Sequence, residues 1–227
     1  MAVIQQLDGR LAAAAAFVRP GAVFADIGTD HAYLPIFLIQ SGHITSAVAA
    51  DVAEGPLSRA RAHIEACGLS DRIRTVLCDG LSGLEAFRPT DIAICGMGGE
   101  LIASILSAAP WVRSPSIRLI LQPMTMQPYL RRYLHTNGFP ILEESLALAN
   151  SRIYPVFLCA YSGEVSELSD ADAYFGGSLL RRRASLPLFY DYLAAKRAQL
   201  SSIRDGKRKA GLPTDAEDAL LDAVSDM

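Results

Sequence analysis

The 227-residue chain has 21 basic and 24 acidic residues, a formal net charge of −3, and 51% hydrophobic residues. This length and composition suit one full α/β domain with a short additional element. No stretch reaches the ~18 consecutive apolar residues that a membrane span requires. Residues 1–17 lack the basic start and apolar centre of a signal peptide. We therefore expect a cytoplasmic protein with no membrane partner, and an amphipathic helix over residues 1–17.

Cysteine and histidine usage argues against disulfides and metal ions. The four cysteines are far apart with no C-x-x-C pair, and the four histidines have no metal-ligand spacing. We expect buried, reduced thiols and no metal site.

Short apolar runs alternate with helical patterns along the first two thirds of the chain. The predicted strands are 22–26, 46–51, 73–77, 91–95, 118–122, 141–149 and 153–161. The predicted helices between them are 33–41, 56–67, 81–87, 100–108 and 128–137. This alternation predicts an α/β fold with a Rossmann-like, mostly parallel seven-stranded sheet. The last two strands follow each other directly, so we expect them to form an antiparallel hairpin at one edge.

The pattern changes after Gly163. Residues 164–172 are polar and predict a linker, followed by helices over 179–204 and 214–224, with Thr214 as the N-cap of the second. We expect residues 1–163 to form the α/β domain and residues 164–227 a small, coiled-coil-like helical domain.

Basic residues are concentrated in the second of these regions. Residues 1–165 carry 12 Arg, no Lys and 14 acids, whereas residues 174–211 carry nine basic residues and two acids. A local positive field of this kind favours a phosphate-rich partner, although each cluster could also be a solvated helix face. The candidate RNA-binding residues are Arg181, Arg182, Arg183, Lys196, Arg197, Lys207, Arg208 and Lys209, aided by Arg131 and Arg132.

A ligand-binding turn is predicted directly after the first strand. Asp26, Gly28, Thr29 and Asp30 stand where open α/β sheets bind ligands, and Gly28 allows close backbone approach. Asp30 replaces the second glycine of the dinucleotide fingerprint, so a pyrophosphate would be repelled. A ligand with ammonium and sulfonium groups would be tolerated, which favours S-adenosylmethionine over NAD. The alternative is a purely structural turn.

Two further strands end in acidic residues. Asp51, followed by Val52, ends the second strand, at the spacing typical of a carboxylate that binds ribose hydroxyls. Asp79 and Gly80 follow the third strand, where an aspartate can bind the exocyclic amine of adenine. A helix N-cap is the alternative for Asp51.

The fourth and fifth strands also end in ligand-binding candidates. Gly96, Met97, Gly98 and Gly99 indicate backbone packed against a ligand, with a flexible turn as the alternative. Gln122 ends the fifth strand near the same predicted pocket.

Taken in order, these segments resemble the bacterial tRNA (adenine-22-N1)-methyltransferase family. The resemblance rests on Asp-Ile-Gly-Thr-Asp-His-Ala-Tyr-Leu-Pro (26–35), Asp-Val-x-x-Gly-Pro-Leu (51–57), Asp-Gly-Leu (79–81), Gly-Met-Gly-Gly (96–99) and Leu-Gln-Pro (121–123). It covers residues 5–163 and extends more loosely into the C-terminal helices. It implies S-adenosyl-L-methionine as cofactor and tRNA as partner. Met124 departs from the family pattern, in which we expect an asparagine that could orient the target base.

The resemblance also implies a mechanism. Adenine N1 carries a free lone pair, so methyl transfer needs positioning more than deprotonation. Asp30 is the candidate that stabilises the cationic product or grips the cofactor, and His31 could contact the base or cofactor or hold the turn. The target base must be unpaired or flipped, with Tyr33 and Tyr154 as stacking candidates or core residues. We expect a monomer.

Two other classes of function remain open at this point. One is a methyltransferase for a small molecule or protein, which the basic segment disfavours. The other is a non-catalytic protein that binds S-adenosylmethionine or RNA, which Met124 would permit.

Overall fold

The computed structural model describes residues 6–227, so the first five residues of the predicted N-terminal helix lie outside the described chain. Helix α1 (Gly9–Phe17) begins after Asp8. The Asp8 carboxylate accepts hydrogen bonds from the backbone N–H groups of Arg10 (2.9 Å) and Leu11 (3.0 Å). These are two of the N–H groups that a helix start leaves without an intrahelical partner.

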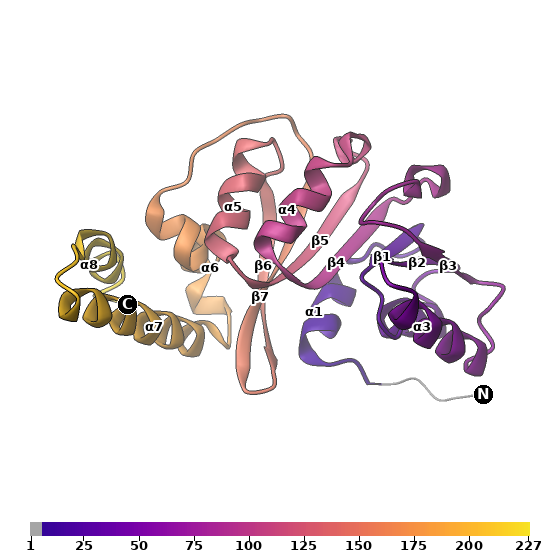
Figure 1. The fold of residues 1–227 in the computed structure, drawn as a ribbon, viewed down its shortest axis with the longest axis horizontal. Helices are drawn as coiled ribbons and strands as arrows, with labels where there is room; N and C mark the ends of the chain where they lie inside the picture. The colour runs from indigo at the N-terminus through magenta and orange to yellow at the C-terminus, as the bar shows by residue number, and fades with distance from the viewer. Residues whose placement is uncertain (1–5) are drawn as a thin grey trace.

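A seven-stranded sheet in the order β3-β2-β1-β4-β5-β7-β6 forms the centre of the molecule (Figure 1). The strands are β1 (Phe24–Ile27), β2 (Ala47–Asp51), β3 (Ile73–Leu77), β4 (Asp91–Gly98), β5 (Arg118–Thr125), β6 (Ile141–Ala149) and β7 (Arg152–Ala160). Strands β1 to β5 pair in parallel, and β7 is antiparallel to both β5 and β6. The predicted fold class and the terminal hairpin are confirmed.

Strands β4 and β5 are longer than predicted. They stay paired past Cys95 and Gln122, where Met97 pairs with Pro123 and Gly98 with Thr125 across irregular registers. The glycine-rich segment is therefore largely a bulged strand end rather than a loop, and bulges of this kind are common beside active sites.

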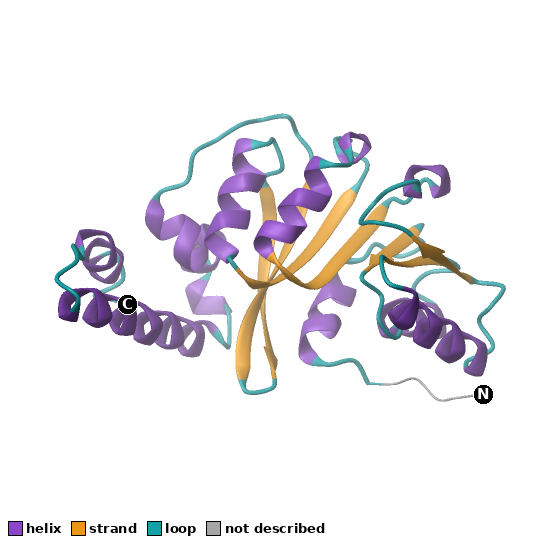
Figure 2. Cartoon of the chain, in the orientation of Figure 1, coloured by secondary structure: helices purple, strands orange, loops and turns teal. Residues whose placement is uncertain are grey.

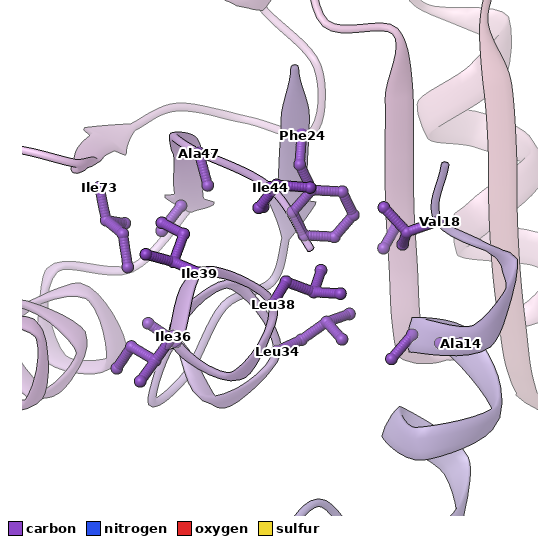
Figure 3. Packing of buried hydrophobic residues seen from close by; sticks show 14 of the residues in the cluster. Ala14, Val18, Phe24, Leu34, Ile36, Leu38, Ile39, Ile44, Ala47 and Ile73 are labelled. Atoms are coloured by element: carbon purple, nitrogen blue, oxygen red, sulfur yellow. The ribbon is translucent and has the colours of Figure 1, made fainter. Parts of the chain in front are cut away.

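Helices cover both faces of the sheet, and each face has its own apolar cluster. On one face α2 (Tyr33–Gln40) packs against Phe24 and Ile73, and the end of α1 lies beside Phe24 (Figure 3). Helix α3 (Glu54–Ala66) adds Ala60 and Ile64 to this cluster. Helices α4 (Gly99–Ser107) and α5 (Gln127–Thr136) cover the other face. Burial on both faces explains why the parallel strands are continuous apolar runs.

The helix predicted over residues 81–87 is only a short 3-10 turn, Leu84–Phe87. Gly83 (φ 75°) and Arg88 (φ 51°) flank it with left-handed backbone conformations. An α-helix needs a negative φ at every residue, so these two residues limit the helical segment to a single short turn.

The C-terminal region is helical but differs in its divisions from the prediction (Figure 2). After the loop 161–169 come a π-helical turn (Asp172–Gly176), α6 (Gly177–Arg181), a 3-10 turn (Arg183–Ser185), α7 (Phe189–Lys209) and α8 (Asp215–Asp222). The predicted helix 179–204 is divided because Pro187 cannot donate a helical hydrogen bond and restricts the residue before it.

Helices α7 and α8 contact each other, and they enclose a third apolar cluster that includes Phe175, Phe189 and Leu200. Thr214 occupies the N-cap position of α8 as predicted. However, its hydroxyl donates to Asp218 Oδ2 (2.7 Å) and makes no capping bond to the helix backbone.

A buried ion pair holds the C-terminal region against the sheet. Arg131 Nε donates to Glu144 Oε1 (2.7 Å), and both side chains are 1% exposed. Arg131 Nη1 also donates to the carbonyls of Ala173 (2.9 Å) and Tyr174 (3.3 Å). The prediction that Arg131 aids phosphate binding is therefore wrong, because its guanidinium is enclosed. Its neighbour Arg132 pairs with Asp170 at the surface.

Candidate cofactor site at the strand ends

A cavity of about 350 Å³ opens at the carboxyl ends of β1, β4 and β5. It brings together the predicted site residues Asp26, Gly28, Thr29, Asp30, His31, Gly96 and Gln122. Its other lining residues are Asp8, Arg10, Leu11, Ala32, Tyr33, Leu34 and Cys95. The cavity lies where open α/β sheets bind their ligands.

The turn after β1 is held by its backbone. The N–H groups of Gly28 and Thr29 both donate to the carbonyl of Ala50 (2.8 and 3.1 Å). Gly28 has φ 75°, and a Cβ at this position would overlap Met97 Cε. Both the left-handed conformation and the contact with Met97 require a glycine here.

Asp26 is a buried carboxylate at the base of the cavity. It is 7% exposed and accepts a hydrogen bond from Thr29 Oγ1 (2.7 Å). Burial raises its pKa to about 6, and the nearby charge of Asp51 adds to this effect. The carboxylate is thus short of cationic partners, which favours a ligand that brings positive charge.

The two predicted catalytic residues line the outer part of the cavity. Asp30 accepts hydrogen bonds from Arg59, and its second oxygen lies 3.7 Å from His31 Nε2. The His31 ring stacks on Tyr33 with centroids 5.1 Å apart, and His63 Nδ1 contacts the His31 carbonyl (2.8 Å). Arg59 therefore offsets much of the charge of Asp30. A catalytic role for Asp30 and His31 stays a prediction.

Gln122 positions the protein backbone. Its fully buried amide accepts from the Gly96 N–H through Oε1 (3.0 Å) and donates to the Pro123 carbonyl (3.4 Å). A Cβ at Gly99 would lie 2.5 Å from the Met126 carbonyl oxygen. The glycine-rich segment thus serves chain packing as well as access to the cavity.

The remaining predicted cofactor residues, Asp51, Val52, Asp79, Gly80, Met97 and Gly98, lie outside this cavity lining. Asp51 accepts from the Ala53 N–H (2.9 Å), just before α3. Burial raises the pKa of the Cys78 thiol, and the charges of Asp79 and then Asp51 raise it further. The Cys78 N–H also donates to the Asp51 carbonyl (3.0 Å), so the ends of β2 and β3 lie side by side.

Apolar surface accompanies these acids. Val52 is 67% exposed, and Asp79 and Gly80 line a separate cavity with Leu101 and Trp111. An exposed valine beside an acidic strand end offers a flat apolar contact to a ring.

The sequence patterns did not identify Asp8 and Arg10 as site residues. Arg10 Nη2 donates to Asp8 Oδ2 (2.7 Å), and Nη1 lies 3.1 Å from Met124 Sδ. Its Nε is buried and has no hydrogen-bond partner among the described residues. The guanidinium lies 5.8 Å from the Tyr154 ring centroid. For this region the sequence predicted only a helix over residues 1–17. Nothing there showed that α1 folds back to the strand ends.

The candidate RNA-binding residues face several different neighbours. Lys207 pairs with Glu217 (2.6 Å) and Arg208 with Asp218 (3.0 Å), both on α8. The other contacts are Arg182 with Glu143 (3.0 Å), Lys196 with Gln127 (3.2 Å), Arg183 with the Leu180 carbonyl (3.1 Å) and Arg197 with the Val224 carbonyl (3.4 Å). Arg181 lines a small cavity beside Arg131, and Lys209 is exposed. Their contact with RNA remains a prediction.

The cysteines are free thiols. Burial, and then the charge of Asp26, raises the pKa of Cys95. The Cys95 side chain in the cavity is therefore a neutral thiol. Over residues 6–227, no group of three His, Cys, Asp or Glu side chains could hold a metal ion. In the same range no helix has the length and hydropathy needed to cross a membrane.

Comparison with known proteins places the chain beside methyltransferases. Residues 7–157 match the family model described as a methyltransferase domain. The chain is 34% identical over 172 residues to the tRNA (adenine(22)-N(1))-methyltransferase of Bacillus subtilis, covering 76% of this chain and 69% of that protein.

Two solved structures share nearly the whole fold. One is a Streptococcus pneumoniae protein with a proposed tRNA (m1A22) methyltransferase activity, solved with S-adenosyl-L-methionine. It has 33% identity, a TM-score of 0.82 and coverage of 95% of this chain and 100% of that one. The other is M. capricolum TrmK with S-adenosyl-homocysteine, at 27% identity, a TM-score of 0.73 and 88% coverage of both chains.

Proposed function

The chain belongs to the tRNA (adenine-22-N1)-methyltransferase family, and from this membership we propose that it transfers the methyl group of S-adenosyl-L-methionine to N1 of adenine 22 in tRNA. The observation that carries the proposal is the cavity in which Asp26, Gly28 and Asp30 meet Arg10. That cavity combines buried negative charge with a guanidinium at the position where this sheet binds a ligand.

The cavity and the neighbouring ends of β2 and β3 suit the cofactor group by group. Asp26, with its raised pKa, would be stabilised by the ammonium group of the methionine portion. The buried Nε of Arg10, which has no hydrogen-bond partner within residues 6–227, is a donor for the carboxylate of the same portion. Asp51 suits the ribose hydroxyls, and the exposed Val52 suits a face of the adenine ring. When bound, the cofactor supplies an electrophilic methyl group.

The residues of the chain would act mainly by positioning. A neutral ring nitrogen attacks without losing a proton, so no general base is needed, and correct alignment supplies most of the acceleration. The Asp30 carboxylate would stabilise the positive charge that develops on the base. Arg59 holds this carboxylate in place and moderates its charge.

Met124 lies beside the cavity, in contact with Arg10, despite its departure from the expected pattern. Its sulfur lies 3.1 Å from Arg10 Nη1 and 3.6 Å from Gln122 Nε2. We propose that Met124 orients Arg10 and that base alignment depends on other side chains. Met124→Asn then changes the KM for tRNA by less than about threefold, because a thioether is a weak acceptor.

We also propose a division of labour along the chain, in a monomer that works with tRNA in the cytoplasm. Residues 1–163 would bind the cofactor, and residues 164–227 would contact RNA. The separate apolar cluster of the C-terminal helices supports this division.

The test is a methyl-transfer assay with radiolabelled S-adenosyl-L-methionine. An unmodified tRNA transcript with adenine at position 22 is compared with a matched transcript that has guanine there. We expect label on the adenine transcript alone. Label on neither transcript, with cofactor binding intact by calorimetry, would contradict the proposed reaction. Methylation of a small molecule or a protein would then be tested.

A further inference from the structure

A second, larger cavity of about 690 Å³ lies between the sheet and the C-terminal helices. We call it the hairpin cleft. Its walls are the β5–α5 turn, the tip of the β6–β7 hairpin and the first half of α7. Its lining residues are Met124, Thr125, Met126, Gln127, Leu148, Ser151, Arg152, Ile153, Tyr154, Pro155, Asp191, Tyr192, Ala195, Lys196 and Gln199.

The sheet topology places this cleft beside the cofactor cavity. Strand β7 is antiparallel to both β5 and β6, so β6 runs in the same direction as β5. The hairpin tip therefore lies at the carboxyl edge of the sheet. Figure 2 shows the hairpin extending past the other strands. Helix α1 contacts both strands of the hairpin on one side, and α7 contacts β7.

Arg10 separates the two spaces. It lines the cofactor cavity, and its guanidinium contacts Met124 and lies over Tyr154, which both line the hairpin cleft. A group held in the cleft beside these two residues is one side chain away from the cofactor cavity. The cleft is therefore close enough to present a substrate atom there.

Two cations, Arg152 and Lys196, and one acid, Asp191, line the cleft, so its net charge suits an anion. Arg152 is exposed at its edge, and Lys196 reaches it from α7. Lys196 Nζ bonds to Gln127 Oε1 (3.2 Å) and lies 5.1 and 5.7 Å from the ring centroids of Tyr174 and Tyr192. In the described chain it forms no ion pair. Burial, and then the charge of Arg131, lowers its pKa to about 8. An ammonium group in this setting gains from a phosphate partner.

The cleft also has soft, flat surfaces of the kind that hold a base. Met126 is 46% exposed and lines the inner wall together with the largely buried Tyr154, and the buried Tyr192 closes the side formed by α7. Aromatic rings and thioethers stack on any base, and stacking is worth about 1–3 kcal/mol per base. Aromatic and thioether surfaces with a nearby cation are what single-stranded RNA recognition uses.

We propose that the hairpin cleft binds the unpaired tRNA strand that carries the target adenosine, with Lys196 and Arg152 holding its phosphates. The inference rests on the proposed function and deepens it, because it assigns the place where the target nucleotide enters. In this arrangement the α7 residue that matters most is the half-buried Lys196. The exposed basic cluster at the end of α7 is secondary.

The first test compares charge-removing variants. Lys196→Gln and Arg152→Gln remove cations from the cleft. Arg113→Gln is the control, because Arg113 is exposed beside the start of β5, at the opposite edge of the sheet. We expect each cleft variant to weaken tRNA binding about tenfold and to reduce the slope of log affinity against log salt by about one. Cofactor affinity by calorimetry should not change.

Lys196→Arg should restore most of the tRNA affinity, because it keeps the cation. If Lys196→Gln misfolds, Arg152→Gln still tests the proposal, because the Arg152 side chain is exposed and its replacement should not disturb the fold. Equal tRNA affinity and salt slope for Arg152→Gln and Arg113→Gln would overturn the proposal.

The second test locates the strand directly. A tRNA with 4-thiouridine next to adenine 22 is irradiated with the full-length protein, and the cross-linked peptides are mapped. We expect cross-links within residues 148–155 or 191–199. If the wild type methylates this tRNA but the cross-links map elsewhere, the assignment of the cleft is wrong and the proposed function stands. If the wild type methylates no tRNA, the proposed function itself fails.

Discussion

The two charged regions of this molecule, the strand ends and the C-terminal helices, arrange their charges in opposite ways. At the strand ends the charge of Asp51 lies close enough to raise the pKa of Asp26, because parallel strands end at one edge of the sheet. In the C-terminal region Lys207 and Arg208 are paired with acids of α8. The sheet topology thus gathers acids at one edge, whereas the packing of α8 against α7 neutralises basic residues. A local count of charges therefore predicts a binding surface only when the neighbouring elements are known.

The largest expected effect concerns the ion pair between Arg131 and Glu144, which holds the C-terminal region against the sheet. Arg131→Met should lower the free energy of unfolding by about 3–5 kcal/mol, because it leaves the Glu144 carboxylate buried without its partner. Urea denaturation measures the loss. Arg132→Met is the matched control, since that arginine pairs with Asp170 at the surface and should cost less than about 1 kcal/mol. Equal losses for the two variants would show that the buried pair has no special role.

Asp26→Asn tests the acidic strand ends. If Asp26 receives a cationic group of the cofactor, this variant should weaken S-adenosyl-L-methionine binding about 10- to 100-fold, the range for a charged hydrogen bond. Isothermal titration calorimetry measures the change. Asp71→Asn, at an exposed position, serves as control. Unchanged cofactor affinity in Asp26→Asn would assign Asp26 a purely structural role.

The raised pKa of Asp26 also predicts a pH dependence of stability. The ordinary aspartate value is 3.8, and the folded protein holds this group at about 6. Between these values the folded state binds more protons than the unfolded state, so stability falls as pH rises. Lowering the pH from 7.5 to 5.5 should add about 1 kcal/mol through this group. Thermal melts of wild type and Asp26→Asn, measured without cofactor at several pH values, isolate this contribution. If the melting temperatures of the two proteins change with pH in parallel, the prediction is wrong.

The smallest effect is expected on α8. Replacing both acids, Glu217→Gln with Asp218→Asn, releases Lys207 and Arg208. Affinity for tRNA should rise about two- to fivefold, with a steeper salt dependence. Filter binding at several salt concentrations measures this, with Asp222→Asn on the same helix as control. An unchanged salt slope would show that this face does not meet RNA.

The sequence predicted the sheet well because its signals are local. Apolar runs such as residues 91–95 mark buried strands, and the acids that follow them mark the ligand edge. The prediction ended this strand at Cys95 and interpreted the glycines that follow as backbone packed against a ligand. The extension of β4 was not predicted because the pairing of these residues depends on β5.

Other parts of the site depend on contacts between distant segments, which no local pattern records. The place of Arg10 in the cavity depends on how α1 packs against the hairpin. The enclosure of Arg131 depends on Glu144 and on a segment 42 residues further along the chain. The ion pairs of Lys207 and Arg208 depend on how α8 packs against α7.

The contact between Arg10 and Met124 spans 114 residues, and the ring of Tyr154 lies still further along the chain. During synthesis the arginine leaves the ribosome first, and its neighbours follow only when most of the sheet has been made. Such non-local pairing is entropically costly and forms late, so the wall between the two cavities is among the last parts to be completed. A nascent chain that stops before the hairpin has most of the strand-end acids and glycines but lacks this wall. Cofactor binding should therefore emerge abruptly with chain length, once the hairpin has folded back onto α1.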